Sequence, residues 1–398
     1  MTLRVFEAFS GIGTQRMALR NLGVDHEVVA ISEIDKYAIK SYEAIHGEVN
    51  NLGDISQVDI KDIPEHDLFT YSFPCQDISV SGKKKGLSKG SGTRSSLLWE
   101  ANRIIEHKRP KYLLMENVKN LLSKRFKGDF LDWLEHLTAL GYRSYWQVLN
   151  AKDYNVPQNR ERVFCVSVLD EHASYHFPET VPLEYRLKDI LLSDVPSKFY
   201  LTNDKTKELI KSIPYHKLIA ILNDVSYGDE KEPTIKQVGN TTPRPKRSNP
   251  QTGRTYHPNG LSPALNTMQG GSRQPQVLLP PYAIGASRGR YINNTADKPA
   301  DKITKQQLEI NGTEATNTLT TVQKDNYVLQ LFDYRIRKLT PQECWRLMGC
   351  TDEDFFKAEA VNSNTQLYKQ AGNAIVVDVL MAIFRELLIN KQPKEGES

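Results

Sequence analysis

Cys75 is the residue of this sequence whose setting most favours chemistry. It follows Pro74 at the end of an apolar run, 67–73, where a nucleophile would be exposed at the end of a strand. Basic residues follow within twenty positions, in a Gly- and Ser-rich stretch typical of a mobile loop: Lys83, Lys84, Lys85, Lys89 and Arg94. A reactive thiol needs partly exposed, electropositive surroundings that favour the thiolate. We interpret Cys75 as a candidate nucleophile, with a buried core cysteine as the alternative.

The amino terminus has the pattern of a nucleotide-binding unit. A strand-like run at 3–9 ends in Ser10-Gly11-Ile12-Gly13, and a helical pattern follows at 14–22. Glu33 comes directly after a second apolar run, where it could accept hydrogen bonds from ribose hydroxyls. The turn lacks the third glycine of the dinucleotide fingerprint, so a nicotinamide cofactor is disfavoured and a structural turn remains an alternative.

Two further acids follow apolar segments. Asp54 comes after Gly53, near the expected end of a third strand, and could bind an adenine amino group or cap a helix. Glu116 follows the run 112–115 and could share a proton with a bound heterocycle, or act as a cap. Both interpretations stay open for each residue.

Gln158, Arg160 and Arg162 alternate along a short segment, which would place them on one face of a strand. The planar guanidinium groups of the two arginines could hold a base carbonyl or a phosphate. A salt-bridged strand surface would have the same pattern.

Strand-like and helical stretches alternate through the first part of the chain. Further apolar runs occur at 67–73, 112–115, 145–149 and 163–168, with helical stretches such as 130–140 between them. This alternation predicts an α/β fold, a mostly parallel sheet covered by helices on both faces. Ligands of such sheets bind at the carboxyl ends of the strands. The candidates that follow strands would therefore collect along one edge: Gly11, Glu33, Asp54, Cys75 and Glu116.

In their order and rough spacing, eight blocks of the sequence resemble the cytosine-C5 DNA methyltransferase family. They are 9–13, Glu33, Gly53-Asp54, Phe73-Pro74-Cys75-Gln76, Glu116-Asn117-Val118, 158–162, 337–343 and 370–375. The resemblance covers roughly 3–180 and 335–385. It implies a Rossmann-like, S-adenosylmethionine-dependent methyltransferase domain that methylates carbon 5 of a cytosine flipped out of duplex DNA.

The resemblance also implies a role for individual residues. Cys75 would add to carbon 6 of the cytosine, Glu116 would bind N3 and the exocyclic amine, and Arg162 with Arg160 would contact the base carbonyl. The implied cofactor contacts are Phe9, Gly11, Ile12, Glu33, Ile34, Asp54, Ile55, Pro74, Leu97 and Asn373. The implied DNA contacts are Gln158 and three residues of a loop that closes over the extruded nucleotide, Ser81, Lys83 and Arg94. Ser10 and Thr14 depart from the family pattern, but both are small.

The middle of the chain has a different composition. Short segments rich in Thr, Asn, Gln, Pro and Gly replace the alternation, and they offer amides, hydroxyls and arginines that can read base edges. We expect a catalytic domain at 1–180, a smaller β-rich, irregular target-recognition domain at 181–331, and a C-terminal segment at 332–398 that returns to the catalytic domain. Arg254 and Arg273 are expected to contact DNA. Two similar stretches, 262–269 and 315–323, are interpreted as paired strands of the smaller domain.

Composition is consistent with a DNA-binding enzyme of the cytoplasm. The net charge is +4 with a pI near 8.6, and the four cysteines form no CxxC pair, which disfavours structural zinc and disulfides. No charged-then-apolar leader or long apolar span is present, which disfavours secretion and a membrane location. We expect a cytoplasmic monomer without a metal, associated with the nucleoid through duplex DNA. A cognate restriction endonuclease is a candidate partner.

Three alternative functions remain. An RNA cytosine-5 methyltransferase of the same architecture is disfavoured because that branch generally has a shorter recognition segment. A nicotinamide-dependent thiol oxidoreductase is disfavoured by the incomplete glycine fingerprint and by Gly372-Asn373. A non-enzymatic DNA-binding module would not need Cys75, Glu116 and two arginines at strand ends.

Overall fold

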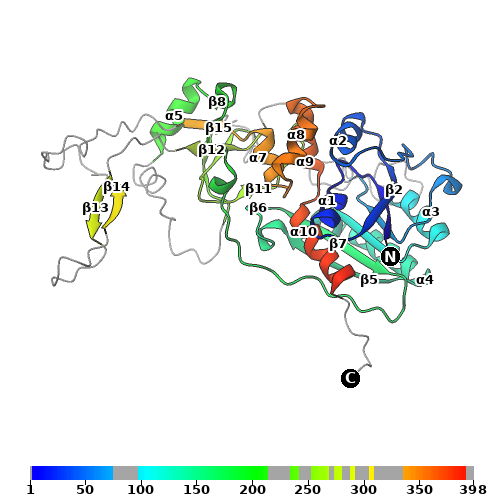
Figure 1. The fold of residues 1–398 in the computed structure, drawn as a ribbon. Helices are drawn as coiled ribbons and strands as arrows, with labels where there is room; N and C mark the ends of the chain where they lie inside the picture. Colours follow the sequence, from blue (N-terminus) through cyan, green and yellow to red (C-terminus); the bar gives the residue numbers. More distant parts are fainter. Residues whose placement is uncertain are drawn as a thin grey trace, which may run out of the picture. The chain divides into compact units, whose positions relative to one another are not determined.

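The chain forms two compact units in a computed structural model (Figure 1). The first unit comprises Met1–Ser193, Leu261–Arg273 and Thr340–Ser398, and the second comprises Asp194–Gly260 and Gln274–Leu339. The structure describes residues 2–74, 97–213, 234–241, 252–268, 273–279 and 335–390, and the backbone of 287–291 and 304–308.

A six-stranded sheet forms the centre of the first unit, in the order β2-β1-β3-β4-β7-β5. Its strands are β1 (Leu3–Ala8), β2 (His26–Ser32), β3 (Leu68–Tyr71), β4 (Tyr112–Val118), β5 (Arg143–Asn150) and β7 (Glu161–Val168). Strands β1 to β4 run parallel, and β7 is antiparallel to both of its neighbours. The predicted α/β fold with a mostly parallel sheet is confirmed.

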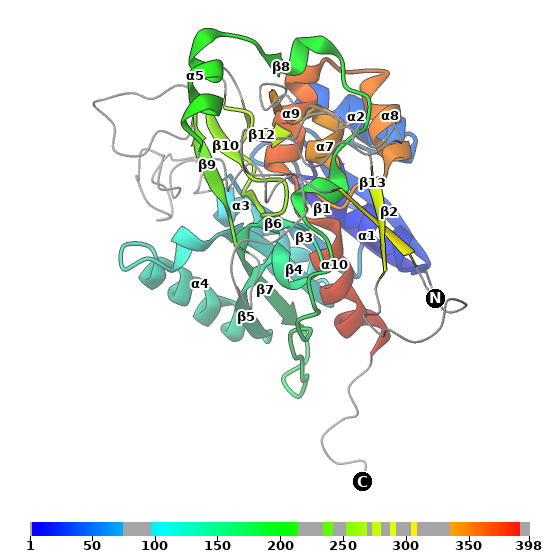
Figure 2. The same cartoon turned by 90° about the vertical axis from the view of Figure 1, so that its left-hand side faces the viewer.

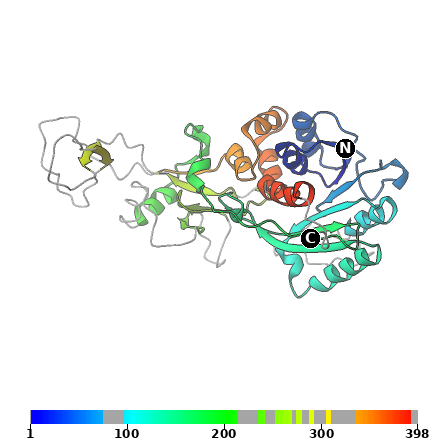
Figure 3. The same ribbon diagram turned by 60° about the horizontal axis from the view of Figure 1, so that its bottom comes forward.

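Helices cover both faces of this sheet (Figure 3). The described helices of the first unit are α1 (Thr14–Asn21), α2 (Lys36–His46), α3 (Leu98–Lys108), α4 (Lys127–Ala139), α7 (Pro341–Arg346), α8 (Asp352–Glu359), α9 (Asn364–Asn373) and α10 (Val377–Phe384), which continues as a π-helix, Arg385–Ile389. Short 3-10 helices span Ile60–Asp62, Lys119–Leu122, Ala151–Asp153, Leu187–Ile190 and Ser197–Phe199.

The alternation of side chains along β1 assigns the helices to the two faces. Phe6 packs in one core cluster with residues of β3, α3 and α4, including Phe69 and Trp133. The next residue, Glu7, therefore points to the opposite face. There its fully buried carboxylate accepts a hydrogen bond of 2.9 Å from the Tyr42 hydroxyl of α2. Helix α1 packs against α10, so the last helix returns to the first.

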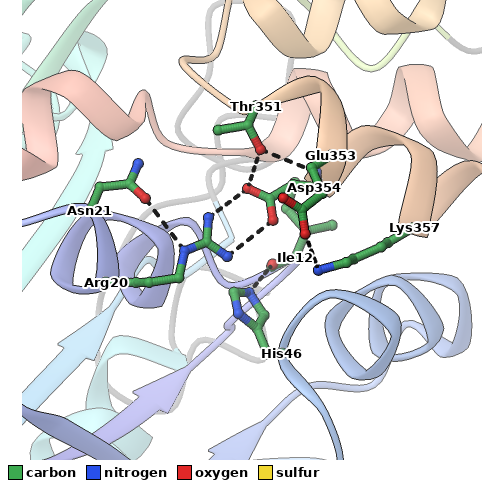
Figure 4. A network of polar contacts seen from close by, with 8 residues as sticks. All are labelled: Ile12, Arg20, Asn21, His46, Thr351, Glu353, Asp354 and Lys357. Carbon is green, nitrogen blue, oxygen red and sulfur yellow. Dashed lines mark hydrogen bonds and ion pairs between the residues drawn. The ribbon is translucent and has the colours of Figure 1, made fainter. Parts of the chain in front are cut away.

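An ion pair joins α1 to α8 (Figure 4). The guanidinium of Arg20 donates two hydrogen bonds, of 3.0 and 2.6 Å, to the carboxylate of Asp354, whose side chain is 3% exposed. Thr351, the N-cap of α8, donates a third of 2.9 Å. Burial alone would raise the pKa of Asp354, but the bonds from Arg20 and Thr351 outweigh it and lower that pKa. The C-terminal helices are thereby fastened to the first helix of the chain.

The second unit is built on a five-stranded sheet in the order β8-β15-β12-β10-β9 (Figure 2). Its elements are β8 (Tyr200–Leu201), α5 (Asp204–Ser212), β9 (Gln237–Asn240), β10 (Arg254–Tyr256), β12 (Gln276–Leu279) and β15 (Arg335–Lys338), and a separate pair joins β13 (Ser287–Tyr291) to β14 (Thr304–Leu308). Ile213, Leu278 and Ile336 form a small core. The smaller part of the chain is β-rich and irregular, as predicted.

Two local expectations are corrected. The strand expected before Gly53 does not form: Asn51 makes an isolated bridge to Ile31, because this polar, Gly-containing segment follows the sheet edge only briefly. The stretch 262–269 belongs to the first unit and is therefore not a strand of the smaller domain. Its β11 (Ser262–Pro263) instead pairs with β6 (Gln158–Asn159) of the first unit, and 315–323 lies outside the described residues.

Among the described helices, none combines the length and the apolar character needed to cross a bilayer.

Candidate active site

A pocket of about 300 Å³ opens at the carboxyl ends of β1 to β4 in the first unit. This volume lies at the lower end of the range for small-molecule sites, about 300–1,000 Å³. Every predicted cofactor contact lines it: Phe9, Gly11, Ile12, Glu33, Ile34, Asp54, Ile55, Pro74, Leu97 and Asn373. Glu116, Arg160 and Arg162 line it as well. Of the five residues expected along one edge of the sheet, Gly11, Glu33, Asp54 and Glu116 line this pocket, and the fifth, Cys75, lies outside the described residues.

The turn between β1 and α1 needs its glycines for different reasons. Gly13 has a φ of 75°, and a Cβ there would lie 2.6 Å from atoms of both Tyr42 and His46 on α2. Gly11 has a φ of 57°, and a Cβ there would meet open space, so its backbone is accessible from the pocket. Ser10 also lines the pocket, and its buried hydroxyl has no hydrogen-bond partner among the described residues.

His46 of α2 is hydrogen-bonded to the same turn at Ile12 (Figure 4). Its Nε2 lies 3.1 Å from the carbonyl oxygen of Ile12. Burial, with a contribution from the charge of Arg16, lowers the pKa of His46 to about 3. The ring is therefore neutral, and Nε2 carries the proton that it donates to Ile12.

Glu33 links the ends of β1 and β2. Its Oε2 accepts from the Gly11 amide at 2.9 Å, and its Oε1 accepts from the amides of Ile34 and Asp35 at 2.9 and 2.8 Å. A carboxylate has about four acceptor positions, so roughly one is left for a ligand hydroxyl. Ile34, beside it, is 72% exposed at the edge of the pocket and can cover an apolar ring.

Asp54 fits both of the roles considered for it. Its Oδ1 accepts from the amide and hydroxyl of Ser56, at 3.0 and 2.8 Å, which is a capped turn. Its Oδ2 accepts no hydrogen bond within the described part of the chain, although the side chain is exposed and lines the pocket. One oxygen shapes the turn and the other is available to a ligand.

Glu116 and Arg162 form an ion pair on adjacent strands. The Nε of Arg162 lies 3.1 Å from Oε1 of Glu116, and their side chains are 18% and 11% exposed. The next residue, Asn117, donates a hydrogen bond of 3.0 Å to the carbonyl of Phe73. This bond holds the end of β4 against the segment that leads to Pro74, the residue directly before Cys75.

Gln158 and Arg160 are held differently from Arg162. Arg160 is 4% exposed and donates to three main-chain carbonyls: those of Leu265, Gly372 and Ala374. Gln158 is fully buried, donates to the carbonyl of Leu347 and accepts from the amide of Leu265. In this arrangement the Gln158 side chain is not accessible to DNA. Contact of either residue with a nucleotide stays a prediction.

Cys75, Ser81, Lys83 and Arg94 lie outside the described residues, so their predicted roles stay predictions. The remaining cysteines, Cys165, Cys344 and Cys350, are buried. Burial raises the pKa of Cys165 to about 12 and also raises the pKa of the other two thiols. Those three are therefore poor sources of a thiolate near neutral pH.

The predicted DNA contacts of the middle region lie in different units. Arg254 is half-buried on β10 of the second unit, and Arg273 is exposed at the end of the segment that belongs to the first. Contact of either arginine with DNA stays a prediction.

The sequence interpretation missed an ion pair on the pocket wall. Lys369 of α9 lies 2.5 Å from the carboxylate of Asp35, the N-cap of α2. Burial alone would raise the pKa of Asp35, but the Lys369 bond and the backbone bonds outweigh it and lower that pKa. A helix-capping signal at Asp35 was available, whereas no pattern pointed to its partner 334 residues away.

These features define a class of protein, a Rossmann-like α/β enzyme with a nucleoside-sized pocket at the carboxyl edge of its sheet. The chain belongs to the C-5 cytosine-specific DNA methylase family, whose model matches residues 3–388. The predicted family and enzyme class, a DNA (cytosine-5-)-methyltransferase, are confirmed.

Relatives match over nearly the whole chain. The type II methyltransferase M2.ScrFI of Lactococcus lactis subsp. cremoris is 36% identical over 440 residues, which cover 97% of this chain and 99% of that protein. The orphan methyltransferase M.SPBetaI of Bacillus phage SPbeta is 34% identical, with 99% of each covered. The type II methyltransferase M.HhaI of Haemophilus parahaemolyticus is 31% identical, with 96% and 93% covered.

Solved structures share the fold. The S. pombe Dnmt2 methyltransferase matches with a TM-score of 0.59 at 17% identity, over 97% of this chain and 98% of that one. The Entamoeba histolytica methyltransferase EhMeth matches with a TM-score of 0.61 at 15% identity, over 99% and 100%. At these identities the likeness describes the fold alone.

Proposed function

We propose that this enzyme transfers the methyl group of S-adenosylmethionine to carbon 5 of a flipped-out cytosine in a specific duplex sequence, through a covalent adduct with Cys75. The observation that carries the proposal is the Glu116–Arg162 ion pair, 3.1 Å across, in the same pocket as the expected cofactor contacts. A base-binding carboxylate and a methyl-donor site within one pocket are what such a transfer requires.

The pocket suits S-adenosylmethionine, on which the family depends and which supplies an electrophilic methyl group. Glu33 has an acceptor position for a ribose hydroxyl, Asp54 has a free oxygen for the adenine amine, and Ile34 offers an apolar face. The accessible backbone of Gly11 and the unpartnered hydroxyl of Ser10 complete a polar wall on the β1 side.

On the cytosine side, the thiolate of Cys75 would form a bond to carbon 6, which makes carbon 5 nucleophilic. Glu116 would hold N3 and the exocyclic amine and stabilise the charge that develops as sulfur adds. Arg162 would contact the base carbonyl and keep Glu116 in place. After methylation a water would remove the proton from carbon 5, and elimination would release Cys75.

Two further parts of the chain are proposed to bind duplex DNA. The base must leave the stack, at a cost of a few kcal/mol, and the stretch 79–96 with Ser81, Lys83 and Arg94 is proposed to close over it. Sequence choice is assigned to 181–331, with Arg254 and Arg273 as DNA contacts. The names of the relatives fit either a type II enzyme with a cognate endonuclease or an orphan phage enzyme.

A tritium-labelled methyl-transfer assay with duplex DNA, RNA or no nucleic acid tests the proposal. Incorporation into carbon 5 of cytosine in DNA alone is expected, and bisulfite sequencing of DNA from an expressing host would then give the target sequence. Preferential incorporation into RNA would instead favour the RNA methyltransferase. The Cys75→Ser variant serves as the inactive control.

A further inference from the structure

We infer that Arg160 is a positioning residue, which acts through Asn373 on the cofactor pocket and ties that pocket to the segment 261–268. This inference rests on the proposed use of S-adenosylmethionine. It separates Arg160 from Arg162, although both are arginines on the pocket wall and only two positions apart.

Arg160 is bonded to the end of α9. One nitrogen of Arg160, Nη2, donates to the carbonyl of Gly372 at 3.0 Å and to that of Ala374 at 2.9 Å. These two residues flank Asn373, whose side chain is exposed and lines the pocket. The last carbonyls of a helix have no partner within the helix, and a cation is favourable there. Arg160 therefore fixes the backbone from which Asn373 projects.

The same guanidinium also binds the segment 261–268. Its Nη1 donates to the carbonyl of Leu265 at 3.0 Å, and Gln158 accepts from the amide of Leu265 at 3.1 Å. The adjacent Asn266 backbone packs so closely on Gly372 that a Cβ at that glycine would collide with it. The segment 261–268 and the end of α9 thus form one packed body with Arg160 at its centre.

The segment that Arg160 holds connects to the second unit at both of its ends. The segment Leu261–Arg273 belongs to the first unit, while the residues before and after it, Gly260 and Gln274, belong to the second. No residue of 261–268, all of which the structure describes, is among those that line the pocket. A change in the cofactor site can therefore reach this connecting segment through Arg160, and the converse holds by linkage.

A lysine cannot replace Arg160 in this role. Its ammonium group lacks the planar fork that bonds the Leu265 carbonyl on one side and the carbonyls at the end of α9 on the other. The test compares Arg160→Lys with its matched control, Arg162→Lys. Calorimetry without DNA gives the affinity for S-adenosylmethionine, and methyl transfer at saturating S-adenosylmethionine gives kcat.

For Arg160→Lys we expect binding weaker by about tenfold or more and a kcat within about threefold of wild type. For Arg162→Lys we expect the reverse: nearly unchanged binding of S-adenosylmethionine and a reduced kcat. The double variant Arg160→Lys/Asn373→Ala should bind no more weakly than Asn373→Ala alone, because both changes act at one contact. Normal binding by Arg160→Lys together with a reduced kcat would overturn the inference and make Arg160 a catalytic residue.

Hydrogen exchange on the wild-type enzyme tests the same inference without a variant that could misfold. Adding S-adenosylmethionine should slow exchange of amides in 261–268, outside the pocket, as well as at Asn373. Unchanged exchange in 261–268 despite measured binding would refute the coupling alone. Failure of the wild-type enzyme to bind S-adenosylmethionine would instead remove the proposed function and this inference together.

Discussion

The carboxylate of Glu116 on β4 lies 3.1 Å from the guanidinium of Arg162 on β7, and both side chains are largely shielded from solvent within the pocket. Under the proposed function, the Glu116 carboxyl would share a proton with the cytosine N3 and accept from its amine, and Arg162 would donate to its carbonyl. Such an arrangement is stable in the free protein because each charge is compensated by the other.

Replacing Glu116 by Gln should lower the rate of methyl transfer by about 10²- to 10⁴-fold, the usual range for a positioned acid or base. The amide oxygen can still accept from Arg162, so the fold should persist. Glu161→Gln is the matched control, because Glu161 pairs with Lys119 and does not line the pocket. Single-turnover rates measure both. Equal rates for the two variants would count against a role for Glu116 in chemistry.

Cys75→Ser should abolish methyl transfer while DNA binding persists, because a hydroxyl has too high a pKa to supply the attacking anion. Duplex DNA with 5-fluorocytosine at the target should trap a denaturation-resistant adduct on the wild-type enzyme. Peptide mass spectrometry locates it. An adduct on Cys165, Cys344 or Cys350 would refute the assignment, and their buried, raised-pKa thiols make that result unexpected.

Asp54→Ala should weaken S-adenosylmethionine binding by about 1–3 kcal/mol, because the adenine amine loses its acceptor. Asp59→Ala is the control: its carboxylate also accepts an amide hydrogen bond two residues on, from Lys61 at 3.0 Å, but it does not line the pocket. Calorimetry compares them. Equal affinities in the two folded variants would reduce Asp54 to a turn residue. Glu33→Ala should cost more than Asp54→Ala, since it also strands the Gly11 amide.

Arg273→Ala should change which sequence is methylated, with about 1–3 kcal/mol less discrimination at one base position. Arg254→Ala should instead weaken binding to all sequences alike and reduce its salt dependence, as for a phosphate contact. Methylation of a randomised site library, with binding at several salt concentrations, separates these effects. Loss of salt slope alone in Arg273→Ala would contradict a base contact for that residue.

Glu7 predicts a pH dependence of stability. Burial raises its pKa to about 7, against the opposing effects of the Tyr42 hydrogen bond and the Arg16 charge. A raised pKa means that the folded state holds the proton more tightly, so its stabilising contribution is lost as pH rises from about 4.5 to about 7. Glu7→Gln, which cannot ionise, should therefore exceed the wild type in unfolding free energy by more at pH 8 than at pH 5, by up to about 3 kcal/mol. Urea denaturation measures this difference, and a gap independent of pH would exclude an ionising Glu7.

Local pattern was enough to predict the sheet and the residues at its edge, because strands, turns and following helices leave periodic traces in the sequence. The same reasoning could not separate Arg160 from Arg162. Both have the same residue type and spacing, and their different partners, carbonyls at 265, 372 and 374 against the Glu116 carboxylate, come from distant parts of the chain. Asp35 and Lys369 were missed for the same reason. The strand predicted before Gly53 was wrong for a different reason. The local pattern indicated a strand, but the segment pairs with the edge strand β2 only at an isolated bridge between Asn51 and Ile31.

The pocket wall contains both Phe9 and Ile375, and the Arg20–Asp354 pair fastens those two ends of the chain to each other. A ribosome adding about 5–20 residues per second needs roughly 20–70 s to make the stretch between the two wall residues. Throughout that interval the emerging polypeptide lacks the part of the pocket wall that lies between Lys369 and Ile375. Under the proposed function we therefore expect methyl transfer only from chains whose synthesis has passed α9 and whose C-terminal helices have packed against α1.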